Sequence, residues 1–419
     1  YSKYNANIYR GMYDLSNKST LLWQHAKLAL RSFFNISEDY EVIFCKSCTE
    51  ALNIAQNIFE QKYQNANIYV DSSGHNSNIL PWIKGNDPLK VKNRVTFLDT
   101  NASGILEMSE IIQKVSSNSR QILNKDEKYV SKEEIVQKIV TINHISNVTG
   151  HVQDIEKIRE ITKKEDAILV VDGAQAVAHI QIDIEKLDPD VYAFSAHKMY
   201  GPLGLGVLII KREHLKDSEP MIRGGGSVNN VTTHNIIWKD GDEKYEAGTQ
   251  NIVGAVGMIS SLIWFTKTLN MFAEKISRNT VGSHDSYPEI EDYLREDFLK
   301  QLDVDDKSWC RIVESEKHLT KYLLDRLSSI DSLRVIGGME LDQRIGVVSF
   351  SIEGVHSHDI ASILGERNIA IRAGTHCANI LHQNMNISNS VRVSLGIYNS
   401  KEDIDRLIEG IIYAKELFR

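Results

Sequence analysis

A lysine and an aspartate each follow an apolar run, where a strand would end. Lys198 lies in the segment FSAHKMYGP at 194–202, and Asp172 ends the run AILVVD. An amine can hold an aldehyde cofactor as a Schiff base, and a carboxylate facing a ring nitrogen keeps a pyridinium protonated. Ser195 and His197 beside the lysine can donate to a phosphate. The pair predicts a pyridoxal phosphate site; the alternative is a lysine in a surface turn.

A polar turn before a helix-period segment indicates where a phosphate would bind. Ser47 and Glu50 form a capping box at the predicted helix start. The free N–H groups and positive dipole end of a helix N-terminus attract phosphate, and Thr49 adds a hydroxyl. Cys45 and Cys48 also spell C-x-x-C at this helix start, which leaves a redox role as the alternative.

The segment RAGTHCA at 372–378 ends an apolar strand and carries a thiol in a polar turn. His376 beside Cys377, with Arg372 nearby, could hold part of this thiol as thiolate, the form that attacks. The alternative is a small buried apolar cysteine. Arg392 lies inside the strand-like run VRVSL, where a guanidinium is out of place unless it binds an anion. Its planar fork suits an α-carboxylate.

A histidine follows another apolar run, KIVTI, and so reaches the same kind of position. The imidazole of His144 could lie over a pyridine ring and carry protons at neutral pH. A hydrogen-bonded loop histidine is the alternative. No metal site is predicted. The spacing from carboxylates that metal ligands require is absent at His144, His151, His179 and His197.

Short apolar runs alternate with helix-period segments over about 41–211, as in a parallel sheet covered by helices. Ligands of such sheets bind beyond the carboxyl ends of the strands, so polar residues just after the strands should meet at one edge. Those residues are Thr49, His144, Asp172 and Lys198. The predicted strands are Glu41–Cys45, Ala66–Val70, Arg94–Leu98, Lys138–Ile142, Ala167–Val171, Val191–Phe194 and Gly206–Ile210.

A second α/β pattern begins after a long apolar helix predicted at about 253–272. It contains a helix at 357–366 and a last helix that Ser400 and Asp403 cap. Its predicted strands are Arg334–Ile336, Gly346–Ile352, Ile369–Arg372 and Val391–Leu395.

The length of 419 residues also favours two domains. We expect an α/β protein with a large doubly wound domain at 25–267, a smaller C-terminal domain at 268–419 and a joining segment at 1–24. Polar stretches at 116–134 and 282–307 are expected to be surface insertions.

Composition excludes several classes of function. The net charge of -8 comes without a basic stripe, so nucleic acid is not an expected partner. No apolar run approaches the roughly 20 residues that span a bilayer. Four scattered cysteines suit a reducing compartment. The sequence begins at Tyr1, and we expect that an upstream presequence or domain segment has been cut away or left out.

The chain resembles the cysteine desulfurases of the class V aminotransferase superfamily, of pyridoxal phosphate fold type I, and within them the SufS-like group II branch. The matching motifs are SAHKMYGP at 195–202, VDGAQ at 171–175, EAGT at 246–249 and RAGTHCA at 372–378, in the family's order. The short span from Cys377 to Arg392 is similar to the SufS-like branch. Tyr9 stands where the family usually has a histidine, and the strand expected before Tyr4 is missing.

The resemblance implies a role for each matching residue at the ring. Lys198 would hold the cofactor aldehyde, Asp172 would pair with the ring nitrogen, and Gln175 would support the ring hydroxyl. His144 would stack on the ring and share proton transfer with Lys198. Cys377 would accept the sulfur.

The resemblance also implies phosphate and substrate ligands. Thr49, Ser195 and His197 would hold the phosphate, and Cys48 stands at a threonine of the family's phosphate turn. Thr249 would reach the phosphate across a dimer interface. The substrate carboxylate would bind to Arg392 and Asn147, with Arg372 beside them.

These roles imply a homodimeric enzyme that converts L-cysteine to L-alanine and leaves a persulfide on Cys377. A SufE- or SufU-like acceptor would pass the sulfur to iron–sulfur cluster assembly by the SUF pathway, in a plastid-type organelle. Alternatives within the fold are a selenocysteine lyase and a transaminase or kynureninase-like enzyme. An alternative of another class is a non-catalytic scaffold for cluster-assembly partners.

Overall fold

The computed structural model describes residues 6–9, 11–83, 95–116, 136–275, 299, 302 and 306–418. The two predicted insertions lie almost entirely outside these residues, so their surface placement stays a prediction. Among the helices in these ranges, none is both long and apolar enough to cross a bilayer.

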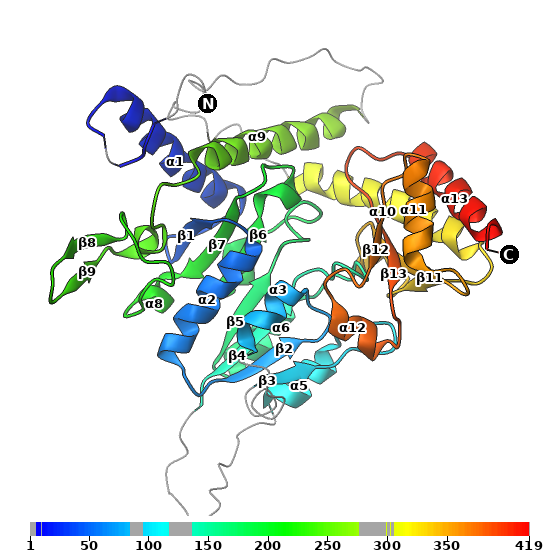
Figure 1. The fold of residues 1–419 in the computed structure, drawn as a ribbon, viewed down its shortest axis with the longest axis horizontal. Coiled ribbons are helices and arrows are strands. Elements are labelled where there is room, and N and C mark those ends of the chain that lie inside the picture. Colours follow the sequence, from blue (N-terminus) through cyan, green and yellow to red (C-terminus); the bar gives the residue numbers. More distant parts are fainter. Residues whose placement is uncertain are drawn as a thin grey trace, which may run out of the picture.

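A seven-stranded sheet forms the centre of the large lobe (Figure 1). Its order is β1-β7-β6-β5-β4-β2-β3, and every neighbouring pair is parallel except those that β7 makes with β1 and β6. The prediction of a mainly parallel α/β sheet is confirmed. The strands are β1 (Tyr40–Cys45), β2 (Asn67–Asp71), β3 (Val95–Leu98), β4 (Lys138–Asn143), β5 (Ala167–Asp172), β6 (Val191–Ser195) and β7 (Gly206–Lys211).

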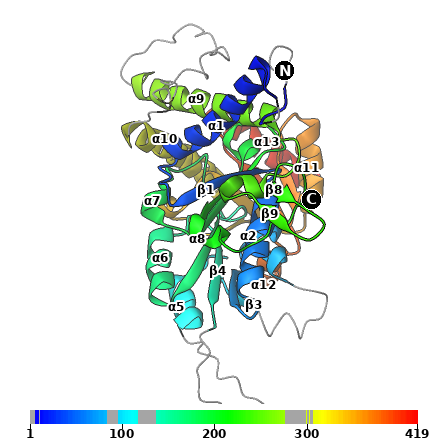
Figure 2. The same cartoon turned by 90° about the vertical axis from the view of Figure 1, so that its left-hand side faces the viewer.

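Helices cover both faces of this sheet (Figure 2). One apolar core joins one face to α1, α6 and α9, and a second joins the other face to α2. Central strands are therefore apolar along almost their whole length, as in β5, where every residue is buried and only the last, Asp172, is polar. The helices of this lobe are α1 (Asp14–Phe33), α2 (Cys48–Lys62), α3 (Asn76–Ile79), α5 (Met108–Ser116), α6 (Ile155–Lys164), α7 (Ile184–Leu187), α8 (Arg212–Leu215) and α9 (Ile252–Lys275).

The small lobe contains a four-stranded antiparallel sheet in the order β10-β11-β13-β12. Its strands are β10 (Leu333–Ile336), β11 (Val347–Ile352), β12 (Arg372–Gly374) and β13 (Ser390–Ser394). The strand predicted at Ile369–Arg372 begins later in the structure. Residues 369–371 are not in a strand, and β12 begins at Arg372. Ile369 and Ile371 pack on the core of this lobe from the approach to the strand, which explains the misleading apolar run.

Three helices cover one side of the small sheet: α10 (Asp306–Ser328), α11 (Ser357–Glu366) and α13 (Lys401–Glu416). The predicted capping box at α13 is present, since Ser400 accepts from the Asp403 N–H and Asp403 accepts from the Ser400 N–H. The predicted domain boundary at 267/268 lies inside the continuous helix α9, and the boundary itself stays a prediction.

The two lobes meet at the carboxyl end of the large sheet. Helix α12 (Asn379–Asn384) of the small lobe lies beside α3 and β2 (Figure 1). Its Leu381 joins Ala378, Val148 and Ile336 in a small apolar cluster that bridges the lobes. The strand ends of the large lobe and the turn after β12 are thereby brought to one place.

Candidate active site

The buried carboxylate of Asp172 lies at the end of β5, at the edge where ligands of such sheets bind. Its Oδ1 accepts from the Ala174 N–H at 3.0 Å and from the Cys48 thiol at 3.5 Å. Burial raises the pKa of Asp172, and these donors oppose that shift. A cationic ring nitrogen placed here would offset the burial of the carboxylate.

The first turn of α2 lies against the end of β6. The Cys48 N–H donates to Ser195 Oγ at 2.7 Å, and Ser47 caps the helix by accepting from the Glu50 N–H. Thr49, the second residue of α2, is exposed. The Cys48 and Glu50 N–H groups already have partners, so this turn offers a phosphate the Thr49 and Ser195 hydroxyls and the positive dipole end of α2.

The C-x-x-C thiols in this turn are poor candidates for redox chemistry. Burial raises the pKa of Cys45 to about 12 and that of Cys48 well above its usual value. Both thiols therefore stay protonated at neutral pH, whereas the thiolate is the reactive form. The geometry disfavours the redox interpretation and leaves Cys48 as a neighbour of Asp172.

Lys198 lies in the short 3-10 helix η2 (Ala196–Met199), directly after β6. Its side chain remains open to solvent, yet desolvation in the cleft lowers its pKa, and the charges of Arg392 and Arg372 lower it further. A lowered pKa increases the share of free amine that can attack an aldehyde. His197 is exposed beside it, and partial burial also lowers the pKa of this imidazole.

His144 is buried directly after β4, beside Asp172. Its Nδ1 lies 2.9 Å from the hydroxyl of Tyr192, and the two rings meet edge to face. Burial lowers the pKa of His144 to about 3, so the imidazole is uncharged at neutral pH. This suits a stacking ring better than the proton carrier predicted from the sequence.

A glycine makes the contact between His144 and Tyr192 sterically possible. A Cβ on Gly173 would lie 2.0 Å from Cε1 of Tyr192. Tyr192 was not among the residues predicted for the site, because it lies within the apolar strand β6. The signal available was its hydroxyl, since a buried tyrosine usually needs a hydrogen-bond partner.

Two arginines face the cleft from the small sheet. Arg372 of β12 and Arg392 of β13 are direct cross-strand partners. Arg392 Nη1 donates to the Asn147 carbonyl oxygen at 3.0 Å, while its buried Nε has no partner among the described residues. Partial burial lowers the pKa of Arg392 to about 10, and the charge of Arg372 adds to the effect. An anionic ligand would relieve both repulsion and desolvation.

The turn after β12 holds Cys377 at the junction of the lobes. Arg372 Nη2 lies 3.5 Å from its sulfur. The Cys377 carbonyl oxygen accepts from the Asn76 N–H at 2.7 Å, which ties the turn to the large lobe. The thiol is half-buried and lies in contact with the Arg372 guanidinium.

The prediction that His376 assists the thiol is wrong. This imidazole is buried away from solvent, and its Nε2 lies 3.0 Å from Ser390 Oγ. Burial lowers the pKa of His376 to about 3, so it carries no positive charge that could stabilise a neighbouring thiolate at neutral pH. Adjacency in sequence was misleading, because the turn directs the two side chains differently.

The remaining predicted site residues differ in how closely they approach Asp172, Lys198 and Cys377. Asn147 is buried, and its Nδ2 donates to the His376 carbonyl oxygen at 2.7 Å, so it supports the turn. Gln175 is half-buried in the turn after Asp172. Thr249 is exposed on a segment that the Gly248 N–H ties to the Gly225 carbonyl oxygen.

His75 belongs to the site but was not predicted. It follows β2 at the same sheet edge, and burial lowers its pKa while the charge of Asp172 opposes that shift. Asn76, its neighbour, holds the Cys377 turn. The edge rule that selected His144 and Lys198 applies equally to His75 and could have found it.

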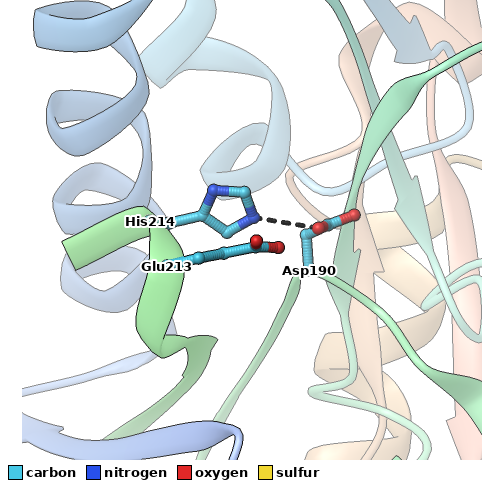
Figure 3. Close-up of side chains that lie close together, drawn as sticks. All are labelled: Asp190, Glu213 and His214. Atoms are coloured by element: carbon cyan, nitrogen blue, oxygen red, sulfur yellow. Dashed lines mark hydrogen bonds and ion pairs between the residues drawn. The ribbon is translucent and has the colours of Figure 1, made fainter. Parts of the chain in front are cut away.

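A second grouping of acid and imidazole has a structural explanation (Figure 3). Asp190, Glu213 and His214 lie close enough to hold a metal ion. However, Asp190 already accepts from His214 at 2.9 Å, from Arg159 at 2.8 Å and from the Leu169 N–H at 2.9 Å. It also precedes β6, at the opposite end of the sheet from Lys198. The cluster links β6 to α8 as an ion-pair network.

Comparisons with known proteins agree with this arrangement. The chain matches the aminotransferase class-V family over residues 1–281 and 298–407. A probable cysteine desulfurase of Halalkalibacterium halodurans is 32% identical over 424 residues, covering all of this chain and 88% of the relative. One of Staphylococcus aureus is 32% identical over 425 residues, covering all of this chain and 87% of the relative.

Solved structures give the same result. A cysteine desulfurase from Thermococcus onnurineus, solved in its apo form, is 27% identical with a TM-score of 0.76, over 99% of this chain and 88% of that one. The cysteine desulfurase CsdA from Escherichia coli is 25% identical with a TM-score of 0.73, over the same shares of the two chains.

Proposed function

Since the chain belongs to the aminotransferase class-V family, whose enzymes depend on pyridoxal phosphate, we propose that it is a cysteine desulfurase. L-cysteine would lose its sulfur to Cys377. The Cβ–S bond of the substrate breaks, a new S–S bond forms on the protein thiol, and Cβ gains a proton. L-cysteine and a thiol thus give L-alanine and a persulfide, with no further oxidant or reductant.

The residues at the strand ends fit the cofactor. Asp172 would pair with its ring nitrogen, His144 would stack on the ring, and the start of α2 with Ser195 would hold its phosphate. When bound, the cofactor supplies an electron sink that makes the α-proton acidic and the substrate sulfur electrophilic. Lys198, with its lowered pKa, is the group we assign to moving that proton.

The arginine pair would orient the substrate. Arg392 and Arg372 together can bind the α-carboxylate in bidentate fashion. The carboxylate of the substrate would then lie at β12 and β13, while its amino group faces Lys198. Its sulfur is left between the two lobes, within reach of a thiol in the turn after β12.

The observation that carries the proposal is the position of the Cys377 turn. The turn is tied to the large lobe through Asn76, and its sulfur lies 3.5 Å from Arg372. The Arg372 guanidinium can therefore orient the sulfur that would attack the substrate. A transaminase would need no thiol at this position.

A homodimer is supported by an exposed apolar hairpin. Strands β8 (Val228–Val231) and β9 (Ile236–Trp238) project from the large lobe (Figure 1). Val231, Ile236 and Ile237 are 61%, 45% and 47% exposed there. An isolated hairpin of this kind is marginally stable, so a second subunit is a suitable cover. We propose that Thr249 of each subunit then reaches the phosphate bound to the other subunit. Light scattering tests the dimer itself, because it measures the molar mass in solution.

The persulfide needs an acceptor. We propose a SufE- or SufU-like protein that carries the sulfur to iron–sulfur cluster assembly by the SUF pathway, in a plastid-type organelle. The support is the resemblance of the motifs around Lys198 and Cys377 to the SufS-like branch. Locating the protein in intact cells tests the compartment.

The experiment that tests the function is an alanine-release assay on cofactor-loaded enzyme with L-cysteine, with and without a candidate acceptor. We expect alanine in amounts that match transferred sulfur, and faster turnover with acceptor. Release of keto acid in place of alanine would indicate a transaminase. A protein that binds cofactor but forms no alanine with cysteine or selenocysteine would overturn the proposal.

A further inference from the structure

The backbone of the Cys377 turn is strained. His376 and Cys377 have φ values of 54° and 58°, in the left-handed region that side chains other than glycine rarely adopt. Each such residue costs conformational free energy, because its Cβ lies too close to the following carbonyl oxygen. The strain persists only where the surroundings determine the conformation strongly, so the turn must be held by specific contacts.

Three buried side chains form a continuous chain of hydrogen bonds behind this turn. His376 Nε2 lies 3.0 Å from Ser390 Oγ, and His382 Nε2 lies 2.9 Å from the same oxygen. His382 Nδ1 lies 3.0 Å from the Ala378 carbonyl oxygen, which returns the chain to the turn. All three side chains are buried, and they come from the turn, β13 and α12.

Hydrogen-bond chemistry gives this chain a single direction. The Ala378 carbonyl oxygen can only accept, so His382 must carry its proton on Nδ1. Burial lowers the pKa of His382, so the ring is neutral and its Nε2 accepts the Ser390 hydroxyl proton. The Ser390 oxygen then accepts from His376 Nε2, and His376 Nδ1 is left as a bare acceptor with no partner among the described residues.

We propose that Ser390 and His382 are positioning residues, which act through His376 to hold the Cys377 turn with its sulfur beside Arg372. Pulling the His376 ring inward stabilises the left-handed conformation of both residues of the turn. The inference rests on the proposed function, because it assigns Cys377 the role of nucleophile. The inference concerns the position of the thiol and not its reaction, and the position of the thiol can be measured without turnover.

The test uses amide hydrogen exchange on cofactor-loaded enzyme. Two amides report on the turn: Ala378, which donates to the Thr375 carbonyl oxygen, and Asn76, which donates to the Cys377 carbonyl oxygen across the cleft. In Ser390→Ala we expect both to exchange at least about tenfold faster, because the turn opens more often. Amides of β11 should keep their wild-type rates.

Kinetics supply the second measurement. In Ser390→Ala we expect kcat for L-cysteine to fall between about tenfold and a hundredfold, because a displaced thiol is rarely aligned for attack. KM should stay within about twofold, since the arginine pair is untouched. Ser390→Thr, which keeps the hydroxyl, should restore most of kcat and the protection of both amides.

A matched control is Ser261→Ala, because Ser261 is a buried serine of α9 whose hydroxyl bonds to the Met258 carbonyl oxygen far from the turn. His382→Gln changes a second residue of the same hydrogen-bond chain, so the proposal can still be tested if the Ser390 variant misfolds. Unchanged turn amides and kcat in both variants would overturn the proposal, as would faster exchange spread evenly over the small sheet. Wild-type enzyme that makes no alanine but has protected turn amides would instead refute the proposed function.

Discussion

Arg372 and Arg392 lie directly opposite each other on β12 and β13, with the Cys377 sulfur 3.5 Å from Arg372. Like charges in this relationship destabilise a sheet. Desolvation lowers the pKa of Lys198 across the cleft, and the charges of the two arginines lower it further. Their mutual repulsion prepares a site for an anion. The same pair can therefore bind the substrate and, through Arg372, contact the Cys377 sulfur.

Replacing Arg392 with lysine tests the binding of the carboxylate. An ammonium cannot make two parallel bonds, and the loss of one charged hydrogen bond costs about 2 kcal/mol, or about thirtyfold in kcat/KM. We expect most of this change in KM for L-cysteine. Arg334→Lys is the matched control, because Arg334 is exposed on β10 of the same sheet. Equal effects of the two substitutions would contradict the assignment.

Lys198→Ala tests the covalent attachment of the cofactor. Wild-type protein should show the absorbance band of the Schiff base. Borohydride reduction should then attach the cofactor irreversibly to the peptide that contains Lys198. The variant should lose both the band and the fixed label, while Lys186→Ala, a change at an exposed lysine of α7, should keep them. A reducible cofactor label on another lysine would refute the role of Lys198.

The buried carboxyl of Asp71 predicts a pH dependence of stability. It accepts from the N–H and the hydroxyl of Ser73, yet burial raises its pKa from 3.8 to about 6. Between these pH values the folded protein retains a proton that the unfolded chain has lost, so the stability falls as pH rises. The loss amounts to about 3 kcal/mol above pH 6.

Asp71→Asn removes this titration and keeps an acceptor for Ser73. We expect its melting temperature, relative to wild type, to rise between about pH 4 and pH 7. Thermal scans of both proteins across that range provide the measurement. A relative stability that is constant with pH would mean that Asp71 ionises normally in the folded protein.

Gly173→Ala tests the support of the stacking ring. The new Cβ would lie 2.0 Å from Tyr192, so the buried ring must shift and His144 loses its hydroxyl partner. Overpacking of this kind costs roughly 1–3 kcal/mol, and we expect weaker cofactor binding in equilibrium titrations. Gly365→Ala in α11 meets nothing within 4 Å and should be neutral or slightly stabilising. Wild-type cofactor affinity in Gly173→Ala would argue against a role for the His144–Tyr192 pair.

Much of the fold followed from the sequence because buried strands leave a strong signal. The apolar run 167–171 predicted β5 to within one residue, since both faces of this strand are covered by helices. Strand β12 was displaced because Ile369 and Ile371 fill the core of the small lobe without belonging to a strand. Apolar character reports burial, and burial alone does not distinguish a strand from the segment leading to it.

The site was less predictable where tertiary packing decides the direction of a side chain. Lys198 and Asp172 could be placed because Asp172 ends β5 and Lys198 closely follows the end of β6, the neighbouring parallel strand. The role of His376 could not be predicted from its position next to Cys377, because a hydrogen bond with Ser390 orients its ring inward. His75 was missed because its polar surroundings resemble an ordinary loop, although β2 ends at the same edge.

Mass spectrometry of the peptide containing Cys377, after a single turnover with L-cysteine and no acceptor, tests the central claim most directly. We predict a gain of the mass of one sulfur atom on Cys377 in amounts equal to the alanine formed. Cys377→Ser should form no alanine while keeping the cofactor absorbance, and Cys310→Ser, at an exposed cysteine of α10, should behave as wild type. Alanine formed at the wild-type rate by Cys377→Ser, or added sulfur on another cysteine, would contradict the account.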